Sequence, residues 1–283
     1  GDILALLNAT DAFIMVLDAK GLVLHLNSVC EATTGCSLQD AKGKYFWDLF
    51  LTAQDAKVVK AAFDLIGESQ FPERYENHLI GKDGTSHWVA WKNTLIRGGE
   101  EDVKYVVSTG INISRRKQVE QSLRRRDAIL EAVSFAASSF LKAGTWETAI
   151  AVVMECLGLA SEVSRVTLCR NYHADDGKIM ASIVYEWTAQ NVERHSDESA
   201  LRNVCWDAPG FNRIFSALKQ GEPISGNVND FNPAEQEIFR QSAITSMLAV
   251  PVFEGQSWWG LIAFEECESE RVWSRAEIDA SKA

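Results

Sequence analysis

Between residues 119 and 140, seven positions, six of them apolar, recur in alternating steps of four and three residues. These positions are Val119, Leu123, Arg126, Leu130, Val133, Ala137 and Phe140, and Arg126 alone among them is charged. A repeat of 3.5 residues places them on one stripe of an α-helix, and such a stripe has to be buried against another element. We therefore expect a long coiled-coil-type helix that pairs with its own copy. The alternative is a helix that packs on its own domain.

The residues before this helix form short apolar runs separated by turns. Strands are predicted at residues 13–17, 22–27, 74–80, 86–96 and 103–113. Short helical pieces occupy residues 28–51, and Thr52 with Asp55 forms a capping box ahead of an amphipathic stretch at 56–66. This order predicts an α+β domain, with a five-stranded antiparallel sheet and helices on one face.

The residues after the long helix follow a second mixed pattern. Strands are predicted at residues 165–172, 180–187, 223–228, 246–253 and 258–264, and helices at 146–159, at 209–220, from 232 and from 274. A long polar segment precedes Trp206. We again expect an antiparallel sheet flanked by helices, so the whole chain belongs to the α+β class with two domains joined by a helix.

Length and composition agree with this division. The chain has 283 residues, 46% of them hydrophobic, which is enough for two ordinary cores. We place the first domain at residues 1–112, a helical linker for dimerisation at 113–143, and the second domain at 144–283, with its last helix cut off by the end of the chain. The formal charge of −11 argues against nucleic acid or an anionic membrane as a main partner. A local excess of basic residues at 113–131 indicates a solvated helix face.

Six cysteines are present, and none forms a Cys-x-x-Cys pair. Their spacing fits neither a disulfide framework nor a zinc site, so we expect reduced thiols, no metal and a cytoplasmic location. No apolar run is long enough to span a bilayer, and the first residues lack the charge pattern of a signal peptide. We expect no membrane contact from this part of the protein.

Four motifs of the first domain resemble those of the PAS sensor family. They are Asp-Ala-Lys-Gly at 18–21 leading to Asn27, Glu-Ala-Thr-Thr-Gly-Cys-Ser at 31–37, Gly-Lys-Asp-Gly at 81–84 followed by His87 and Trp88, and Asn-Ile-Ser-Arg-Arg-Lys at 112–117. The resemblance implies a pocket between sheet and helices that holds haem, flavin, a small acid or nothing. Residues 41–45 depart from the family's flavin motif, and residues 53–66 contain no His for a haem. The cofactor is therefore left unassigned.

Three stretches of the second domain resemble the GAF family. They are residues 247–253 and 259–264, which resemble its core strands, and residues 273–279, which resemble its Trp-Ser-x-x-Glu ending. The resemblance implies a small-molecule pocket. Cys205 is followed by Trp206 and not by His, which argues against a covalently attached bilin. The ligand-site candidates are the aromatic and polar residues around the family's pocket region: Tyr185, Trp187, His195, Asn203, Cys205 and Trp206. The alternative is that the tryptophans only fill the core.

The sequence contains no recognisable catalytic pattern. Phosphate-binding glycine loops, zinc-protease motifs, nucleophile elbows, cyclase and phosphodiesterase signatures and kinase phospho-acceptor motifs are all absent from the sequence. Residues 195–198 are interpreted as a polar loop, and the acids at 265, 266, 268 and 270 as a solvated loop instead of a cation site.

The sequence therefore predicts a tandem PAS–GAF sensory region of a bacterial two-component or related signalling protein. It is expected to be non-catalytic, to form a homodimer, to bind a small ligand, and to pass a conformational change to an effector domain in the same polypeptide. That effector is a histidine kinase or a cyclic-di-nucleotide enzyme. Two alternatives stay open: a purely structural dimerisation module, and a fragment of an enzyme whose active site lies in the second domain.

Overall fold

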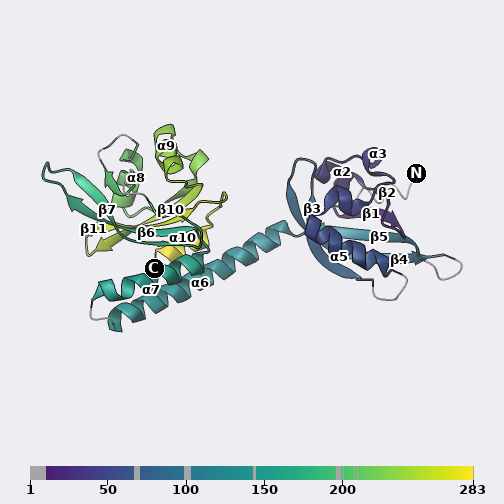
Figure 1. Cartoon of the computed structure of the whole chain (residues 1–283), viewed down its shortest axis with the longest axis horizontal. Coiled ribbons are helices and arrows are strands. Elements are labelled where there is room, and N and C mark those ends of the chain that lie inside the picture. Colours follow the sequence, from purple (N-terminus) through teal and green to yellow (C-terminus); the bar gives the residue numbers. More distant parts are fainter. Residues whose placement is uncertain are drawn as a thin grey trace. The chain divides into compact units, whose positions relative to one another are not determined.

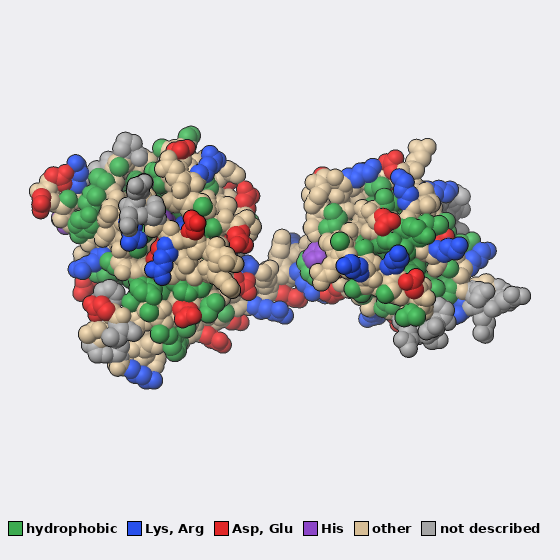
Figure 2. Space-filling model, viewed as in Figure 1, with side chains coloured by type: hydrophobic (Ala, Val, Ile, Leu, Met, Phe, Trp, Pro, Cys, Tyr) green, Lys and Arg blue, Asp and Glu red, His purple; other side chains and the backbone are tan. Residues whose placement is uncertain are grey.

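The computed structural model in Figure 1 describes residues 11–66, 71–98, 103–142, 145–195, 199, 201–206, 208 and 210–282. It divides into two compact units, residues 1–119 and 120–283. The predicted α+β class, with two antiparallel sheets joined by a long helix, is confirmed. Figure 2 shows Lys and Arg intermixed with Asp and Glu on the visible face of each unit.

The first unit contains a five-stranded antiparallel sheet in the order β2-β1-β5-β4-β3. Its strands are β1 (Phe13–Asp18), β2 (Val23–Leu26), β3 (Arg74–Ile80), β4 (Ser86–Arg97) and β5 (Val103–Asn112). Its helices are α2 (Ser28–Thr34), α3 (Leu38–Ala41), α4 (Phe46–Phe50) and α5 (Ala53–Asp64). The Thr52 side chain caps α5 by accepting from the backbone N–H of Asp55, as the capping box predicts. Helix and sheet residues such as Phe50, Phe63 and Trp91 share one hydrophobic core.

The second unit contains a six-stranded antiparallel sheet in the order β8-β7-β6-β11-β10-β9. Its strands are β6 (Arg165–His173), β7 (Ile179–Thr188), β8 (Asn203–Cys205), β9 (Ile224–Asn227), β10 (Ser246–Glu254) and β11 (Ser257–Glu266). The short strand β8 lies inside the long polar segment that precedes Trp206. It escaped prediction because three residues are too few to show a period.

Helices cover both faces of this second sheet (Figure 1). On one face α8 (Asn212–Lys219), the 3₁₀ turn η1 (Val228–Asp230) and α9 (Pro233–Gln241) enclose a core with residues such as Trp206, Phe239 and Met247. On the other face α6 (Ser114–Lys142), α7 (Trp146–Ser161) and α10 (Arg275–Ser281) contribute to a second core with Met154, Val166 and Phe264. The sheet thus separates two different environments.

Candidate functional site

A cavity of about 50 Å³ lies in the second unit, between the sheet and helices α8 and α9. Most of its lining is apolar, and includes Cys169, Trp206, Ile214, Leu218, Phe239, Met247, Ala249, Leu261 and Ala263. A single buried water needs roughly 10–15 Å³. The cavity is therefore large enough for a molecule of a few heavy atoms.

One end of this cavity is polar, because four charged or ionisable side chains are buried together beside it. Arg165 of β6 donates to Glu265 of β11, with Nε 2.6 Å from Oε2, and also to the carbonyl oxygens of Glu193 and Ser242. Glu186 of β7 lies 2.5 Å from Nδ1 of His195 and also accepts from the His195 backbone N–H. The four side chains expose 4% or less of their surface.

The buried group combines one arginine, one histidine and two carboxyl side chains. Burial acts to raise the pKa of Glu186, but the hydrogen bonds from His195 and the nearby Arg165 hold that pKa below its ordinary value. Burial also raises the pKa of the Cys169 thiol to about 12, with Glu265 and Glu186 adding to the effect, so this thiol stays protonated. The polar end is therefore an ionic structure set into an apolar wall.

Two polar atoms of the cavity wall have no hydrogen-bond partner among the described residues. They are Nε2 of His195 and Oγ1 of Thr167, and both are buried. His195 Nε2 lies 3.6 Å from Oε2 of Glu265, which is beyond hydrogen-bonding distance. Because an unpaired buried polar group is unfavourable by about 1–3 kcal/mol, these atoms mark where a ligand's polar group would be stabilised.

The structure brings two of the six predicted ligand-site residues, His195 and Trp206, to this cavity. Trp206 is fixed there by a hydrogen bond from its Nε1 to Asn171. Tyr185 and Trp187 pack instead on the opposite face of the sheet, in the core beside α7. They flank Glu186 on β7, and neighbouring side chains of a strand point to opposite faces.

Asn203 and Cys205, the remaining two candidates, lie on the short edge strand β8 and do not line the cavity. Sequence reasoning missed Arg165, Glu186 and Thr167. It also wrongly interpreted Glu265 as part of a solvated loop, whereas the Glu265 residue is only 3% exposed. His195 was interpreted as a polar-loop residue and is likewise buried. The available signal was a charged residue inside an otherwise apolar strand, since such a charge has to be paired.

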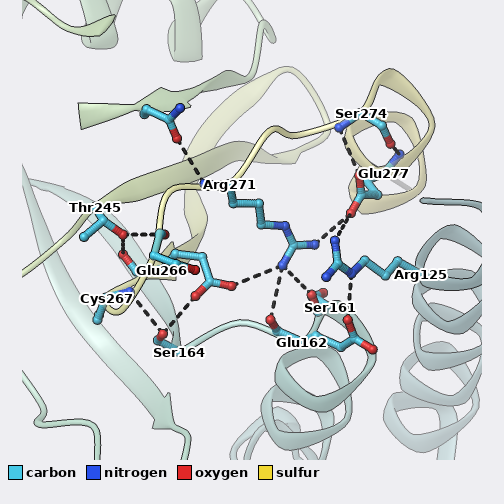
Figure 3. Close-up of polar contacts among 12 residues, drawn as sticks. Arg125, Ser161, Glu162, Ser164, Thr245, Glu266, Cys267, Arg271, Ser274 and Glu277 are labelled. Carbon is cyan, nitrogen blue, oxygen red and sulfur yellow. Dashed lines mark hydrogen bonds and ion pairs between the residues drawn. The ribbon is translucent and has the colours of Figure 1, made fainter. Parts of the chain in front are cut away.

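A second polar network lies on the opposite face of the sheet, centred on Arg271 (Figure 3). Its guanidinium donates to Glu277 of α10 at 2.7 Å, to Glu266 of β11 at 3.3 Å, and to the carbonyl oxygens of Ser161 and Glu162 at 2.7 and 3.2 Å. The same group stacks on the ring of Trp273, 4.2 Å from its centroid. Arg271 thereby joins a strand end, the carboxyl end of α7 and helix α10.

Helix α6 enters the same network. Arg125 donates from Nε to Glu162 at 2.7 Å, its Nη1 lies 3.9 Å from Oε1 of Glu277, and Ser122 donates to Ser274 at 2.6 Å. Burial acts to raise the pKa of Glu277, but bonds from Ser274 and Arg271 hold it below its ordinary value. Glu277 is therefore a buried carboxylate shared between two arginines.

The predicted heptad seam of α6 is largely exposed. Val119, Leu123 and Phe140 expose 52%, 48% and 40% of their surface. Arg126 is also exposed and pairs with its neighbour Asp127. A different stripe of α6, containing the buried residues Ile129, Ala132 and Ala136, faces the helix's own domain. Helix α6 thus has one face packed within the chain and an apolar stripe that is exposed at most of its positions, with Val133 half-buried against the core beside α7.

The start of α6 is attached to the sheet of the first unit. Asn112 accepts from the backbone N–H of Ser114 at 2.9 Å, and its amide lies 3.5 Å from Nδ1 of His87. Glu76 on β3 forms ion pairs with Arg116 at 2.7 Å and with Lys117 at 2.6 Å, and these hold its pKa below the usual range, Lys117 most strongly. Strands β3 and β5 of the first unit are therefore joined directly to the first turn of helix α6.

Within the part of the chain that the structure describes, no helix is both long and apolar enough to cross a membrane. In the same ranges, no three His, Cys, Asp or Glu side chains are grouped as metal ligands.

Comparison with known families identifies both units. The family model for the PAS fold matches residues 1–113, and the model for the GAF domain matches residues 145–282. The chain therefore consists of PAS and GAF domains in tandem.

Two similar curated proteins are sensor histidine kinases, both distant. The chain is 28% identical to the methanogenesis regulatory histidine kinase FilI of Methanothrix harundinacea, over 94% of this chain and 30% of that protein. It is 27% identical to the sensor histidine kinase TmoS of Ectopseudomonas mendocina, over 42% of this chain and 13% of that protein. The chain thus spans less than a third of the length of either relative. Among solved structures, the chromophore-binding domain of a Stigmatella aurantiaca bacteriophytochrome covers 96% of this chain and 90% of its own, at 11% identity and a TM-score of 0.44.

Proposed function

We propose that this PAS–GAF tandem is the non-catalytic sensory part of a sensor histidine kinase. The cavity of the GAF domain binds a small molecule, and α6 pairs with its own copy and passes the change to the effector domain. The single observation that supports ligand binding best is the apolar cavity with two unpartnered polar atoms in its wall. The two related kinases support the choice of effector over a cyclic-di-nucleotide enzyme.

The wall chemistry favours a neutral, mainly apolar ligand with one hydrogen-bonding group. The lining offers apolar contact almost everywhere, and the polar atoms converge at the His195 end. The lining carries no side chain that would directly balance a charge placed in the middle of the cavity, so a charged ligand would be buried without a matching charge, which is strongly unfavourable. A hydroxyl group can donate and accept, and so can bond with both His195 and Thr167.

This ligand class can be tested with three probes of equal chain length: 1-butanol, butanoate and butylammonium. The protein contains four methionines, and Met247 lines the cavity while Met15 lies in the PAS core. With ¹³C-methyl methionine labelling, we expect 1-butanol to shift the Met247 signal saturably, at roughly millimolar concentration for a ligand of so few atoms. Met15 serves as the internal control, and a Met247→Leu variant assigns the signal.

The two ionic probes are expected to leave the Met247 signal unchanged at the same concentrations. A saturable shift with butanoate or butylammonium alone would contradict the neutral ligand class. If ethanol, 1-propanol, 1-butanol and 2-butanone all leave Met247 unchanged, the cavity is not a ligand site. A dimer without any bound ligand would then favour the structural-module alternative.

The proposal of a homodimer rests on the exposed apolar stripe of α6. An apolar seam that repeats every 3.5 residues gains stability when a second helix covers it, and the other face of α6 is already occupied by its own GAF domain. In a parallel pair the Arg126 side chains would face each other and repel, although each can extend toward solvent. The seam would therefore be weakest near its centre, as a switchable contact requires.

Replacing both Leu123 and Leu130 with glutamate is expected to convert the dimer to a monomer. Burying the new carboxylates in the seam would be unfavourable by several kcal/mol. Sedimentation velocity at matched protein concentration measures the result. The control is Phe135→Glu with Leu141→Glu, since these residues are also exposed on α6 but lie off the seam. If the seam variant sediments like the wild type, α6 is not the dimer interface.

A further inference from the structure

We propose that Arg271 is the positioning residue that couples the GAF-domain cavity to the dimer helix α6. This inference rests on the proposed function and adds the route by which occupancy of the cavity reaches the seam. It assigns a role to the Arg271, Trp273, Ser274 and Glu277 segment, whose resemblance to the GAF ending says nothing about ligand or output.

The route begins at the carboxyl end of strand β11, where two adjacent glutamates point to opposite faces of the sheet. Glu265 lies beside the cavity and pairs with Arg165, while Glu266 bonds to Ser164 and Arg271 on the helix side. Adjacent residues of a strand alternate in direction, so a small shift or twist of this strand end displaces both side chains together. A ligand that bonds with His195 acts directly on the group that holds Glu265.

The second step is Arg271 itself, which is 7% exposed and bonds to parts of the chain that are distant in sequence. Its two terminal nitrogens contact Glu266, Glu277 and the last carbonyl oxygens of α7 (Figure 3). Its Nε is buried without a hydrogen-bond partner in the described residues. One N–H donor of the guanidinium is therefore unused. It gives Arg271 a second way to hold a carboxylate, as a two-state element requires.

The third step leads from Glu277 to α6. The carboxylate of Glu277 is shared by Arg271 and Arg125, so a closer bond to one arginine weakens its attraction for the other. Ser274, which caps α10 with Glu277, also accepts a hydrogen bond from Ser122. Ser122 and Arg125 are the immediate neighbours of the seam residues Leu123 and Arg126. A change in these contacts rotates or loosens the helix where the seam begins.

Hydrogen exchange measured by mass spectrometry on the full chain tests this coupling. In the wild type, 1-butanol at a concentration that saturates Met247 is expected to change exchange in peptides from α6 around residues 120–130. In Arg271→Gln, we expect 1-butanol to bind with an affinity within about threefold of wild type, while the change in α6 is lost. Arg275→Gln is the matched control, since Arg275 stands at the start of α10, close to Arg271 in the sequence, but its side chain is 96% exposed; this variant should respond like the wild type.

Three further variants keep the test decisive. Arg271→Gln combined with Glu277→Gln removes the buried pair without leaving Glu277 unpaired, and serves if Arg271→Gln alone does not fold. Arg271→Lys keeps the charge and is expected to restore part of the response. Ala263→Val places extra methyl groups in the cavity, and should alter α6 exchange without any ligand, but only while Arg271 is present.

The outcomes separate the two levels of the proposal. If 1-butanol and its relatives do not bind, yet Ala263→Val changes α6 exchange only with Arg271 present, ligand binding fails and the coupling stands. If cavity occupancy changes α6 equally with and without Arg271, the coupling role is wrong. A merely structural role would change exchange in both states by the same amount and leave the ligand-induced difference intact.

Discussion

Replacing Arg165 with methionine is expected to destabilise the GAF domain by about 3–5 kcal/mol, because it leaves two buried carboxylates with only His195 between them. Net domain stabilities are only about 5–15 kcal/mol, so this single change brings the domain close to unfolding. The two carbonyl oxygens that accept from Arg165 would also lose their partner. We expect no comparable loss in the PAS domain, since Arg165 belongs to the other unit.

Urea titration followed by the methionine methyl signals measures the two domains separately. Met247 reports on the GAF domain and Met15 on the PAS domain. The control is Arg170→Met, which removes the same charge from the same strand at an exposed position. If Arg165→Met and Arg170→Met shift the Met247 transition equally, the buried ionic group contributes no special stability.

Gly260→Ala is the second substitution with a large expected effect. A Cβ at this position on β11 would lie 2.0 Å from the carbonyl oxygen of Cys169 on the paired strand β6. The clashing atom belongs to the backbone and cannot move away by a side-chain rotation, so strands β6 and β11 have to separate or shift in register. Overpacking is typically unfavourable by about 1–3 kcal/mol, and we expect this case at or above the upper end.

Gly255→Ala provides the contrast for that prediction. Gly255 has a positive φ of 60°, but a Cβ there meets nothing within 4 Å. Its replacement should destabilise the domain by only about 1 kcal/mol, the conformational term alone. The same Met247 titration compares the two variants. A Gly260→Ala protein as stable as Gly255→Ala would show that strands β6 and β11 are not packed as closely as described.

The α+β class, the two sheets and most strand positions were predictable, because turns, capping residues and short apolar runs are local signals. Which residues share a face of the second sheet was not predictable. The segment from Ser246 to Val250 is buried throughout, so the alternation that would distinguish the two faces is absent. The pairing of β6 with β7 also shifts register, because Leu168 pairs with Tyr185 and Cys169 with Ile183, which leaves an extra residue on β7. The sequence groups Tyr185 and Trp187 with His195 because all three lie around the family's pocket region, although the two aromatic residues lie on the other face.

The long helix shows the same limit in another form. Two stripes run along α6, and hydrophobic periodicity detects the more apolar one. The stripe that faces the GAF domain contains Ser122, Arg125, Ile129, Ala132 and Ala136, which are small or polar and give a weak pattern. Its contacts with α10 through Arg125 and Ser122 depend on residues about 150 positions away in the sequence, as the separation of 152 for Ser122 and Ser274 shows. Local reasoning cannot find such pairs.

The central claim is that occupancy of the GAF-domain cavity is coupled to dimer pairing along the α6 seam. The most direct test is the dimer dissociation constant, measured by sedimentation equilibrium with and without saturating 1-butanol. If ligand binding is thermodynamically linked to dimer formation, the ligand has to change the dimer dissociation constant. Typical coupling free energies change such a constant by about fivefold or more. The same alcohol added to Ala263→Val, whose cavity is already filled, measures the effect of the solvent alone. The account predicts a change of at least about fivefold in the wild type beyond that solvent effect. An equal dissociation constant with the cavity empty and occupied, while Met247 reports binding, would contradict it.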